Sequence, residues 1–181
     1  DLAAGQEVPI ATGGWPKFGL AVGGTIVVWR ETVGPSGGNT YREMVGKDVS
    51  NGQVFRFADH EDSRGVTVLD RVVYHAAQPA GESWEKVYAY DVDTGQTQMV
   101  SPPLYDEHHT RPNADGHYVT WQASNLSTDL YVLDTHTGSL TSAVHPESGA
   151  SPYFPFVGGD SIFFTRFGAG AWVVQEYGIH T

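Results

Sequence analysis

The sequence predicts an all-β protein made of four repeated units, and its composition, strand pattern and repeat length carry that prediction. The 181 residues include 22 glycines and 10 prolines, and 12% of them are aromatic. This balance is rich in turns and disfavours helix bundles and coiled coils. The length suits a single domain with a sizeable core and is short for two domains.

The charge balance excludes several kinds of partner. Lys and Arg number 10 against 21 Asp and Glu, which gives a net charge of -11. Such a chain repels phosphate, so we expect no nucleic-acid partner. No run reaches the roughly 18 apolar residues of a membrane helix, so we expect no membrane insertion. The absence of cysteine excludes disulfides and thiolate metal sites.

The start at Asp1 without a methionine and the scarcity of lysine lead us to expect a secreted or periplasmic protein. We expect it to be a monomer.

Four apolar or aromatic strands recur along the chain. They are TIVVWRE from Thr25, DRVVYHA from Asp70, HYVTWQA from His117 and SIFFTRF from Ser161. Their alignment places four residues in register at spacings of 45, 47 and 44 residues: Trp29, Tyr74, Trp121 and Thr165. Because the first three are large aromatics at the repeat period, we expect them to pack in the core.

Each of the first three strands is followed by a hairpin of two further strands. In each hairpin an aspartate stands four residues before a glycine: Asp48 and Gly52, Asp91 and Gly95, Asp134 and Gly138. The aspartate can accept hydrogen bonds from its own turn, and the glycine provides the positive φ that a short loop requires.

The fourth unit has its second strand, AWVVQEY from Ala171, and no third. We expect the other terminus to supply the missing strand, because GQEVPIAT from Gly5 matches GQTQMVSP from Gly95 in length and pattern. Repeats of about 45 residues with four short strands each are typical of β-propeller blades.

We therefore predict a four-bladed β-propeller whose last blade is closed by an N-terminal strand, Gly5 to Ala11. The blades would span approximately residues 13–58, 59–101, 102–145, and 146–181 plus 1–12. The alternative is a set of four units from a larger ring of six or seven blades.

Two segments, KVYAYDVDTGQTQMVS and DLYVLDTHTGSLTSAV, resemble the propeller repeats of the periplasmic TolB type. Those repeats read as an apolar strand, an Ile-Tyr-Val-x-Asp-like strand and a Thr-Gly turn. The resemblance implies the propeller architecture and no activity, because such repeats occur in transport accessories, peptidase propellers, polysaccharide lyases and binding modules. The Pro-Asp-Gly that is common in the family appears here only as Asn113-Ala114-Asp115-Gly116.

The loops that join one blade to the next gather at one mouth of a propeller, which makes that mouth the default site. Counting back ten residues from Tyr74 and Trp121 gives two arginines in equivalent positions, which could clamp a carboxylate or a sulfate. The alternative is that each arginine pairs with its acidic neighbours. With nearby histidines and aromatics, the predicted ligand-binding residues are Trp15, His60, Arg64, His109, Arg111 and Tyr153.

The same loops hold a set of residues with the side-chain chemistry of a divalent metal site: His60, Asp62, Asp106 and His108. Imidazole and carboxylate groups suit zinc, manganese or iron. The spacing is not diagnostic, and the alternative is a set of solvated acidic loops.

No recognisable catalytic constellation is present, so whether the protein is an enzyme stays open. The first hypothesis is a non-catalytic exported binding or scaffold module that recognises a protein or glycan through the channel mouth. The second is a carbohydrate-active enzyme, of the polysaccharide lyase or hydrolase type, acting on an acidic glycan with arginines neutralising the carboxylate and perhaps with a metal. The third is a purely structural interaction domain.

Overall fold

The computed structural model describes residues 9–13, 16–33, 41–59, 65–79, 81–104, 107–124, 128–144, 152–168 and 170–179. These residues form four antiparallel sheets whose strands follow one another in chain order. The all-β fold with four units is confirmed. In this part of the chain no helix is long and apolar enough to cross a membrane.

The strands of the four sheets have the following bounds. The first sheet contains β1 (Lys17–Gly23), β2 (Ile26–Val33), β3 (Tyr41–Asp48) and β4 (Val54–Asp59). The second contains β5 (Val66–Leu69), β6 (Val72–Ala77), β7 (Lys86–Asp91) and β8 (Thr97–Met99). The third contains β9 (His108–Asp115), β10 (Tyr118–Ser124), β11 (Thr128–Asp134) and β12 (Leu140–Val144). The fourth contains β13 (Pro152–Gly158), β14 (Ser161–Gly168) and β15 (Ala171–Gly178).

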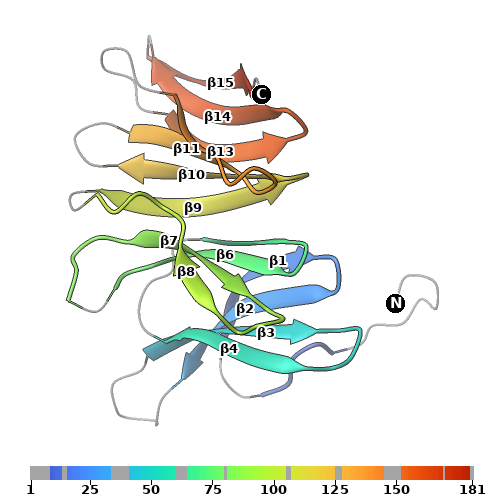
Figure 1. Ribbon diagram of the computed structural model, residues 1–181. Coiled ribbons are helices and arrows are strands. Elements are labelled where there is room, and N and C mark those ends of the chain that lie inside the picture. Colours follow the sequence, from blue (N-terminus) through green and yellow to red (C-terminus); the bar gives the residue numbers. More distant parts are fainter. Residues whose placement is uncertain are drawn as a thin grey trace.

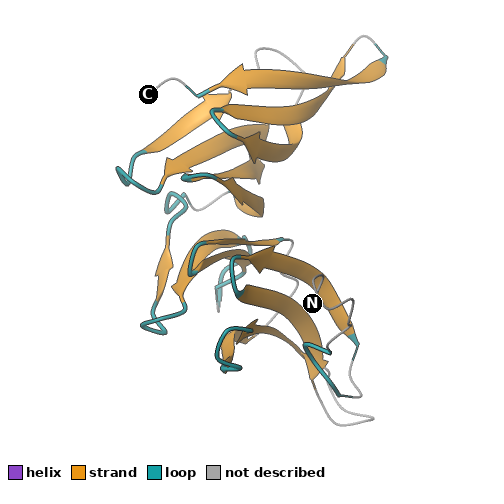
Figure 2. Cartoon of the chain, turned by 90° about the vertical axis from the view of Figure 1, so that its right-hand side faces the viewer, coloured by secondary structure: helices purple, strands orange, loops and turns teal. Residues whose placement is uncertain are grey.

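The sheets follow one another from the bottom to the top of Figure 1, and the side view in Figure 2 shows the same succession. The first strands β1, β5, β9 and β13 contact one another in turn, so they form the inner side of the array. The first and fourth sheets lie at opposite ends of it (Figure 1).

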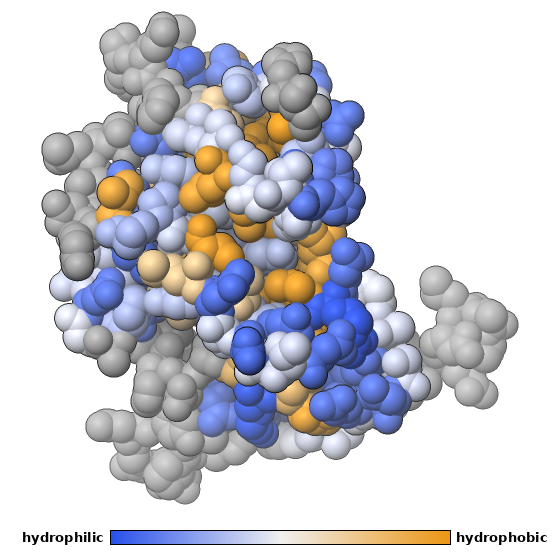
Figure 3. All heavy atoms as spheres, viewed as in Figure 1, coloured by the Kyte–Doolittle hydropathy of each residue, from blue (hydrophilic) through white to orange (hydrophobic). Residues whose placement is uncertain are grey.

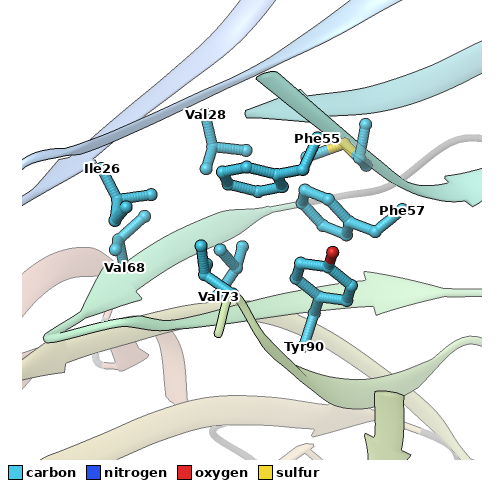
Figure 4. Packing of buried hydrophobic residues seen from close by; sticks show 9 residues of the cluster. Ile26, Val28, Phe55, Phe57, Val68, Val73 and Tyr90 are labelled. Carbon is cyan, nitrogen blue, oxygen red and sulfur yellow. The ribbon is translucent and has the colours of Figure 1, made fainter. Parts of the chain in front are cut away.

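Apolar side chains fill the space between successive sheets. Phe55 and Phe57 of the first sheet stack on Tyr90 of the second, with ring centroids 5.6 and 4.7 Å away (Figure 4). Tyr74 and Val87 pack against Trp121 between the second and third sheets. A third cluster joins the third and fourth sheets: Tyr118, Leu130, Val132, Val157, Ile162 and Phe164.

The three aspartate turns form as predicted. In the first, Ser50 N donates to Asp48 Oδ1 at 2.9 Å, and Gly52 N donates to the Asp48 carbonyl at 2.8 Å. The second and third turns repeat this arrangement. The glycines that close the three turns have φ of 79°, 70° and 72°: Gly52, Gly95 and Gly138.

The predicted register of the repeat was wrong by one residue in two of the units. The turns between first and second strands carry left-handed residues at Gly24, Asp70, Gly116 and Gly159. Counting from these turns, the equivalents of Trp29 are His75, Trp121 and Phe164, at spacings of 46, 46 and 43 residues.

Packing agrees with the corrected register. The His75 ring contacts Phe57 of the preceding sheet edge-on at 5.2 Å, whereas Tyr74 packs with Trp121 of the following sheet. Successive residues of a strand point to opposite faces, so the slip assigned Tyr74 to the wrong one. Burial of Trp29, Tyr74 and Trp121 in the core is confirmed.

The expected closing strand falls mostly on residues 1–8, which lie outside the described ranges. Ile10 and Ala11 are described and lie on the first sheet. Lys47 Nζ donates to the Ile10 carbonyl at 3.2 Å, and Ala11 packs against a cluster that contains Trp29 and Val45. Within the described ranges the fourth sheet has three strands, and β15 forms its edge.

Candidate functional site

Irregularities in β9 and β13 position the two residues at the centre of the candidate site. The pairing of β9 with β10 shifts around Arg111, and that of β13 with β14 shifts around Phe154. Both residues have positive φ, 59° and 54°. A bulge of this kind interrupts the alternation of side chains between the two faces of the sheet. A residue with a side chain is also strained in the left-handed conformation.

The two bulges bring a cation onto an aromatic ring. Arg111 Cζ lies 4.0 Å from the centroid of the Phe154 ring. Both side chains are exposed. No described acidic residue forms an ion pair with Arg111, so its guanidinium presents donors that a ligand carboxylate can accept in bidentate fashion.

Two further aromatic rings, those of Tyr153 and Trp172, extend the surface that begins with Phe154. The Tyr153 ring centroid lies 6.4 Å from that of Phe154 and 5.7 Å from that of Trp172 on β15. Trp172 is 59% exposed. We call Arg111, Tyr153, Phe154 and Trp172 the mouth cluster.

A buried histidine lies behind the start of β9. His109 has no exposed surface, and its Nδ1 accepts a hydrogen bond from Trp121 Nε1 at 3.1 Å. In the neutral ring the proton is therefore on Nε2, which lies 3.4 Å from Glu107 Oε2. Burial, with the nearby Lys86 charge, lowers the pKa of His109 to about 4, so the ring is neutral at pH 7.

The next residue in this series of contacts, after Trp121 and His109, is Glu107. Burial raises its pKa, and the charge of Asp129 adds to the effect while Lys86 opposes it. The Glu107 side chain is still 22% exposed, so it can meet a ligand. A partly buried carboxyl group with a raised pKa is a candidate for proton transfer.

His108 faces a different partner. Its Nδ1 contacts Glu85 Oε2, and its ring meets Trp84 edge-on at 4.4 Å. Lys86 is buried nearby and donates to the carbonyl oxygens of Leu104 and Glu107. Glu85 also accepts the His109 backbone N–H at its carbonyl oxygen, at 2.9 Å. These contacts tie the connection before β9 to the start of β7.

The predicted ligand-binding residues fall into three groups. Arg111 and Tyr153 come together, with Phe154 between them. His109 is buried behind Glu107 rather than exposed at the surface. The remaining three lie outside the described residues and stay predictions: Trp15, His60 and Arg64.

The predicted metal ligands are mostly untested. His60, Asp62 and Asp106 lie outside the described ranges, and His108 is engaged by Glu85. Among the residues that the structure describes, no group of three or more His, Asp or Glu side chains could hold a metal ion.

The equivalence of Arg64 and Arg111 was off by one residue. In the corrected register the position ten residues before His75 is Gly65, and those before Trp29 and Phe164 are Gly19 and Phe154. All four positions in this series have positive φ. The correct repeat register would have placed Phe154 beside Arg111 from the sequence. Trp172 gave no signal in the sequence, and Glu107 was marked only as one of several acidic residues on the loops between blades.

No family model matches the sequence, and no curated protein matches it. Solved structures do match. TolB from Acinetobacter baumannii aligns with a TM-score of 0.55 at 16% identity, over 98% of this chain and 48% of its own. An oligogalacturonate lyase in complex with manganese aligns with a TM-score of 0.61 at 13% identity, over 96% and 57% of the two chains. The propeller domain of the trilobed protease from Pyrococcus furiosus aligns with a TM-score of 0.62 at 8% identity, over 89% and 57%.

This fold is a β-propeller fold. At these identities the likeness concerns the fold alone. The chain spans about half the length of these matched structures. In propeller terms, the four sheets are consecutive blades, their first strands are the inner strands, and the mouth cluster lies on the inner strands of the third and fourth blades and the edge strand of the fourth.

Proposed function

We propose that the protein is a non-catalytic binding module that recognises a carboxylate-bearing glycan at the mouth cluster. The observation that carries this proposal is the exposed Arg111 guanidinium over the exposed Phe154 ring, both on strained bulges. A guanidinium pairs with a carboxylate, and neighbouring exposed rings offer flat apolar faces to a sugar. We place this function outside the cytoplasm, in keeping with the expectation from the sequence.

The test is a calorimetric titration with a uronic-acid oligosaccharide and with a neutral oligosaccharide of the same length. We expect only the acidic ligand to bind, and we expect Arg111→Ala to weaken binding at least about tenfold, the loss of a charge-assisted bidentate contact. Alanine is strained at the positive φ of this position as arginine is, so the substitution removes the guanidinium without changing the backbone strain.

Arg56→Ala is the control, because Arg56 is also exposed and lies on β4 in the first blade, paired with Glu43. Equal binding of the neutral sugar, or equal losses in the two variants, would contradict the proposal.

One observation favours a second function, an enzyme acting on an acidic glycan. Glu107 has a raised pKa and faces His109, whose ring is fixed by Trp121. Such a carboxyl group could transfer a proton while Arg111 neutralises the substrate carboxylate. This second proposal includes a divalent metal ion. Its proposed ligands outside the described ranges are His60, Asp62 and Asp106.

The enzyme proposal is tested by incubating the protein with the acidic oligosaccharide, with and without added manganese or zinc. Products would be followed by the absorbance of unsaturated sugars and by reducing ends. Product formation that is lost in Glu107→Gln supports an enzyme. Binding without product supports the binding module.

A further inference from the structure

The first aspartate turn contains an asparagine followed by a glycine, the pair of residues whose side-chain amide is lost most readily in water. Asn51 precedes Gly52 in this turn, whereas the equivalent turns have a threonine before the glycine, Thr94 and Thr137. Of the four asparagines in the sequence, only Asn51 is followed by glycine. Because glycine has no side chain, it leaves the backbone nitrogen that attacks the amide unhindered.

Water reaches this turn. Asn51 and Gly52 are exposed, and the turn joins β3 to β4 on the right-hand side of Figure 1. Figure 3, in the same view, shows hydrophilic residues gathered at the lower right, where the first two blades lie. Both the water that the reaction consumes and the base that starts it therefore have access to the turn.

The reaction is a hydrolysis that passes through a ring. The backbone nitrogen of Gly52 loses its proton and bonds to Asn51 Cγ, and the side-chain amide nitrogen takes up that proton and leaves as ammonia. Water then opens the five-membered succinimide at either carbonyl, which yields aspartate or isoaspartate at position 51. One water is consumed and one ammonia is released, so the step needs no oxidant or reductant.

The folded turn holds both reacting groups of this step. Gly52 N, the attacking nitrogen, donates to the Asp48 carbonyl at 2.8 Å. Asn51 Nδ2, the leaving nitrogen, donates to Asp48 Oδ2 at 3.4 Å, and Asn51 Oδ1 accepts from Gln53 N at 2.8 Å. Cyclisation must break these hydrogen bonds, so it requires the turn to open.

Asp48 is in turn held by the second blade. Its side chain is 1% exposed, and Arg71 Nη1, from the turn between β5 and β6, donates to Asp48 Oδ2 at 2.8 Å. The hydrogen bonds from Ser50 and then Arg71 hold the pKa of Asp48 well below its usual range, so the carboxylate stays ionised in neutral and alkaline solution. The order of the first aspartate turn therefore depends on its contact with the second blade.

We propose that Asn51 is a deamidation site that the Asp48–Arg71 ion pair between the first and second blades keeps unreactive. The modification makes an opening of this contact permanent. In the aspartate product a carboxylate oxygen replaces the amide donor and repels Asp48 Oδ2. In the isoaspartate product the main chain gains one carbon before Gly52, which changes the spacing across the turn. This proposal does not depend on glycan binding.

The test compares the folded chain with the chain unfolded in guanidinium chloride, both incubated at mildly alkaline pH. Mass spectrometry follows the peptide that contains Asn51. We expect the folded chain to deamidate there at least about tenfold more slowly, because the reaction waits for local opening. Arg71→Ala should speed the reaction in the folded chain about threefold, since it removes an ion pair with one exposed partner.

Arg56→Ala is the matched control, because Arg56 is exposed on β4 of the first blade and pairs with Glu43 rather than with the turn. Circular dichroism checks that both variants are folded. If Arg71→Ala is not, the folded chain in guanidinium chloride below its unfolding transition replaces it, and the rate should rise with the denaturant. Equal rates in the folded and unfolded chains, or equal rates in Arg71→Ala and Arg56→Ala, would overturn the proposal.

Asn51→Thr tests the consequence of the modification. In the third aspartate turn Thr137 Oγ1 donates to Asp134 Oδ2 at 2.8 Å and accepts from Ser139 N at 3.3 Å. Threonine at position 51 can make the same two contacts and has no amide to lose. After equal incubation we expect the deamidated chain to melt at a lower temperature than Asn51→Thr. Equal melting temperatures would show that the modification leaves the contact between the blades intact, contrary to the proposal.

Discussion

At the scale of single residues, a glycine allows the second and third blades to approach each other closely. A Cβ on Gly65 would lie 2.8 Å from Arg111 Cα and 3.0 Å from Pro112 Cδ, which are backbone and ring atoms that cannot move aside. Its φ of 150° is also a conformation that residues with side chains rarely adopt. Gly65 therefore sets the spacing of the second and third blades next to the mouth cluster.

We expect Gly65→Ala to lower the free energy of unfolding by at least about 2–3 kcal/mol, from overpacking and strain together. Gly138→Ala is the control, because Gly138 has a φ of 72° and nothing within 4 Å of an added Cβ. It should cost only the strain, about 1 kcal/mol. Urea unfolding of both variants makes the comparison, and equal losses would mean that blade spacing is not fixed here.

A second residue-scale prediction concerns His75, which is buried against Phe57 and Tyr88, and neither of its ring nitrogens has a hydrogen-bond partner among the described residues. Burial lowers the pKa of His75 from 6.5 to about 4. Between pH 6.5 and about pH 4, the unfolded chain therefore binds a proton at His75 that the folded chain does not bind. Stability is full above pH 6.5 and falls between pH 6.5 and pH 4, by roughly 3 kcal/mol from this residue.

His75→Phe should flatten the fall in stability over that pH range, because phenylalanine binds no proton. Urea unfolding from pH 7 to pH 4 provides the measurement. His136→Phe is the control, since it replaces an exposed histidine at the turn after β11 and leaves His75 in place. An unchanged slope in His75→Phe would show that His75 is solvated in the folded state.

At the scale of secondary-structure elements, the bulged inner strands combine strain with the candidate site. Arg111 and Phe154 hold left-handed conformations that glycine adopts at the equivalent Gly19. Glycine at these two positions would avoid the strain, so Arg111 and Phe154 keep their side chains at a cost in stability. Strain of this kind gathers at functional sites.

We expect Arg111→Gly to be more stable than Arg111→Ala by about 1 kcal/mol, because glycine relieves the strain that alanine keeps. Both variants should bind the acidic glycan equally poorly. Thermal unfolding and calorimetry measure the two properties separately. Equal stability of the two variants would show that the left-handed conformation is not imposed at this position in solution.

The elements also show how far the sequence could lead. Four units, three aspartate turns and the buried aromatic positions followed from periodicity and turn chemistry. The register failed because Tyr74 resembles tryptophan more than His75 does, although His75 has the equivalent environment. The neighbours Arg111 and Tyr153 were predicted, but the role of Phe154 depends on a bulge, and the contact of His109 with Glu107 depends on burial that composition does not reveal.

At the scale of the whole molecule, contacts join each blade chiefly to the blades next to it in the chain. The free energy of unfolding of such an array is close to the sum of the intrinsic stabilities of the blades and the interface energies between neighbouring blades, as in repeat proteins. The third blade has neighbours on both faces, and β10 is buried along nearly its whole length. By contrast, β15 is exposed and pairs with one strand within the described ranges.

Hydrogen exchange should show this gradient. In dilute monomer we expect the slowest amide exchange in β10 and the fastest among the strands in β15, because end openings expose β15 without disrupting the inner blades. Mass spectrometry of peptides covering the two strands makes the measurement. Equally slow exchange in β15 would indicate that its edge is covered in the isolated chain.

The succession of the blades also bears on how the chain folds during synthesis. Since the described contacts of each blade are chiefly with the blades next to it, each new blade can dock on the one before it as soon as it leaves the ribosome. The sequence separation of contacting residues stays within about two repeats, which keeps the loop-closure entropy of each step small. The fourth blade is the last of the described blades to emerge. Until it docks, the third blade exposes to chaperones the side chains that the fourth blade buries, among them Tyr118, Leu130 and Val132.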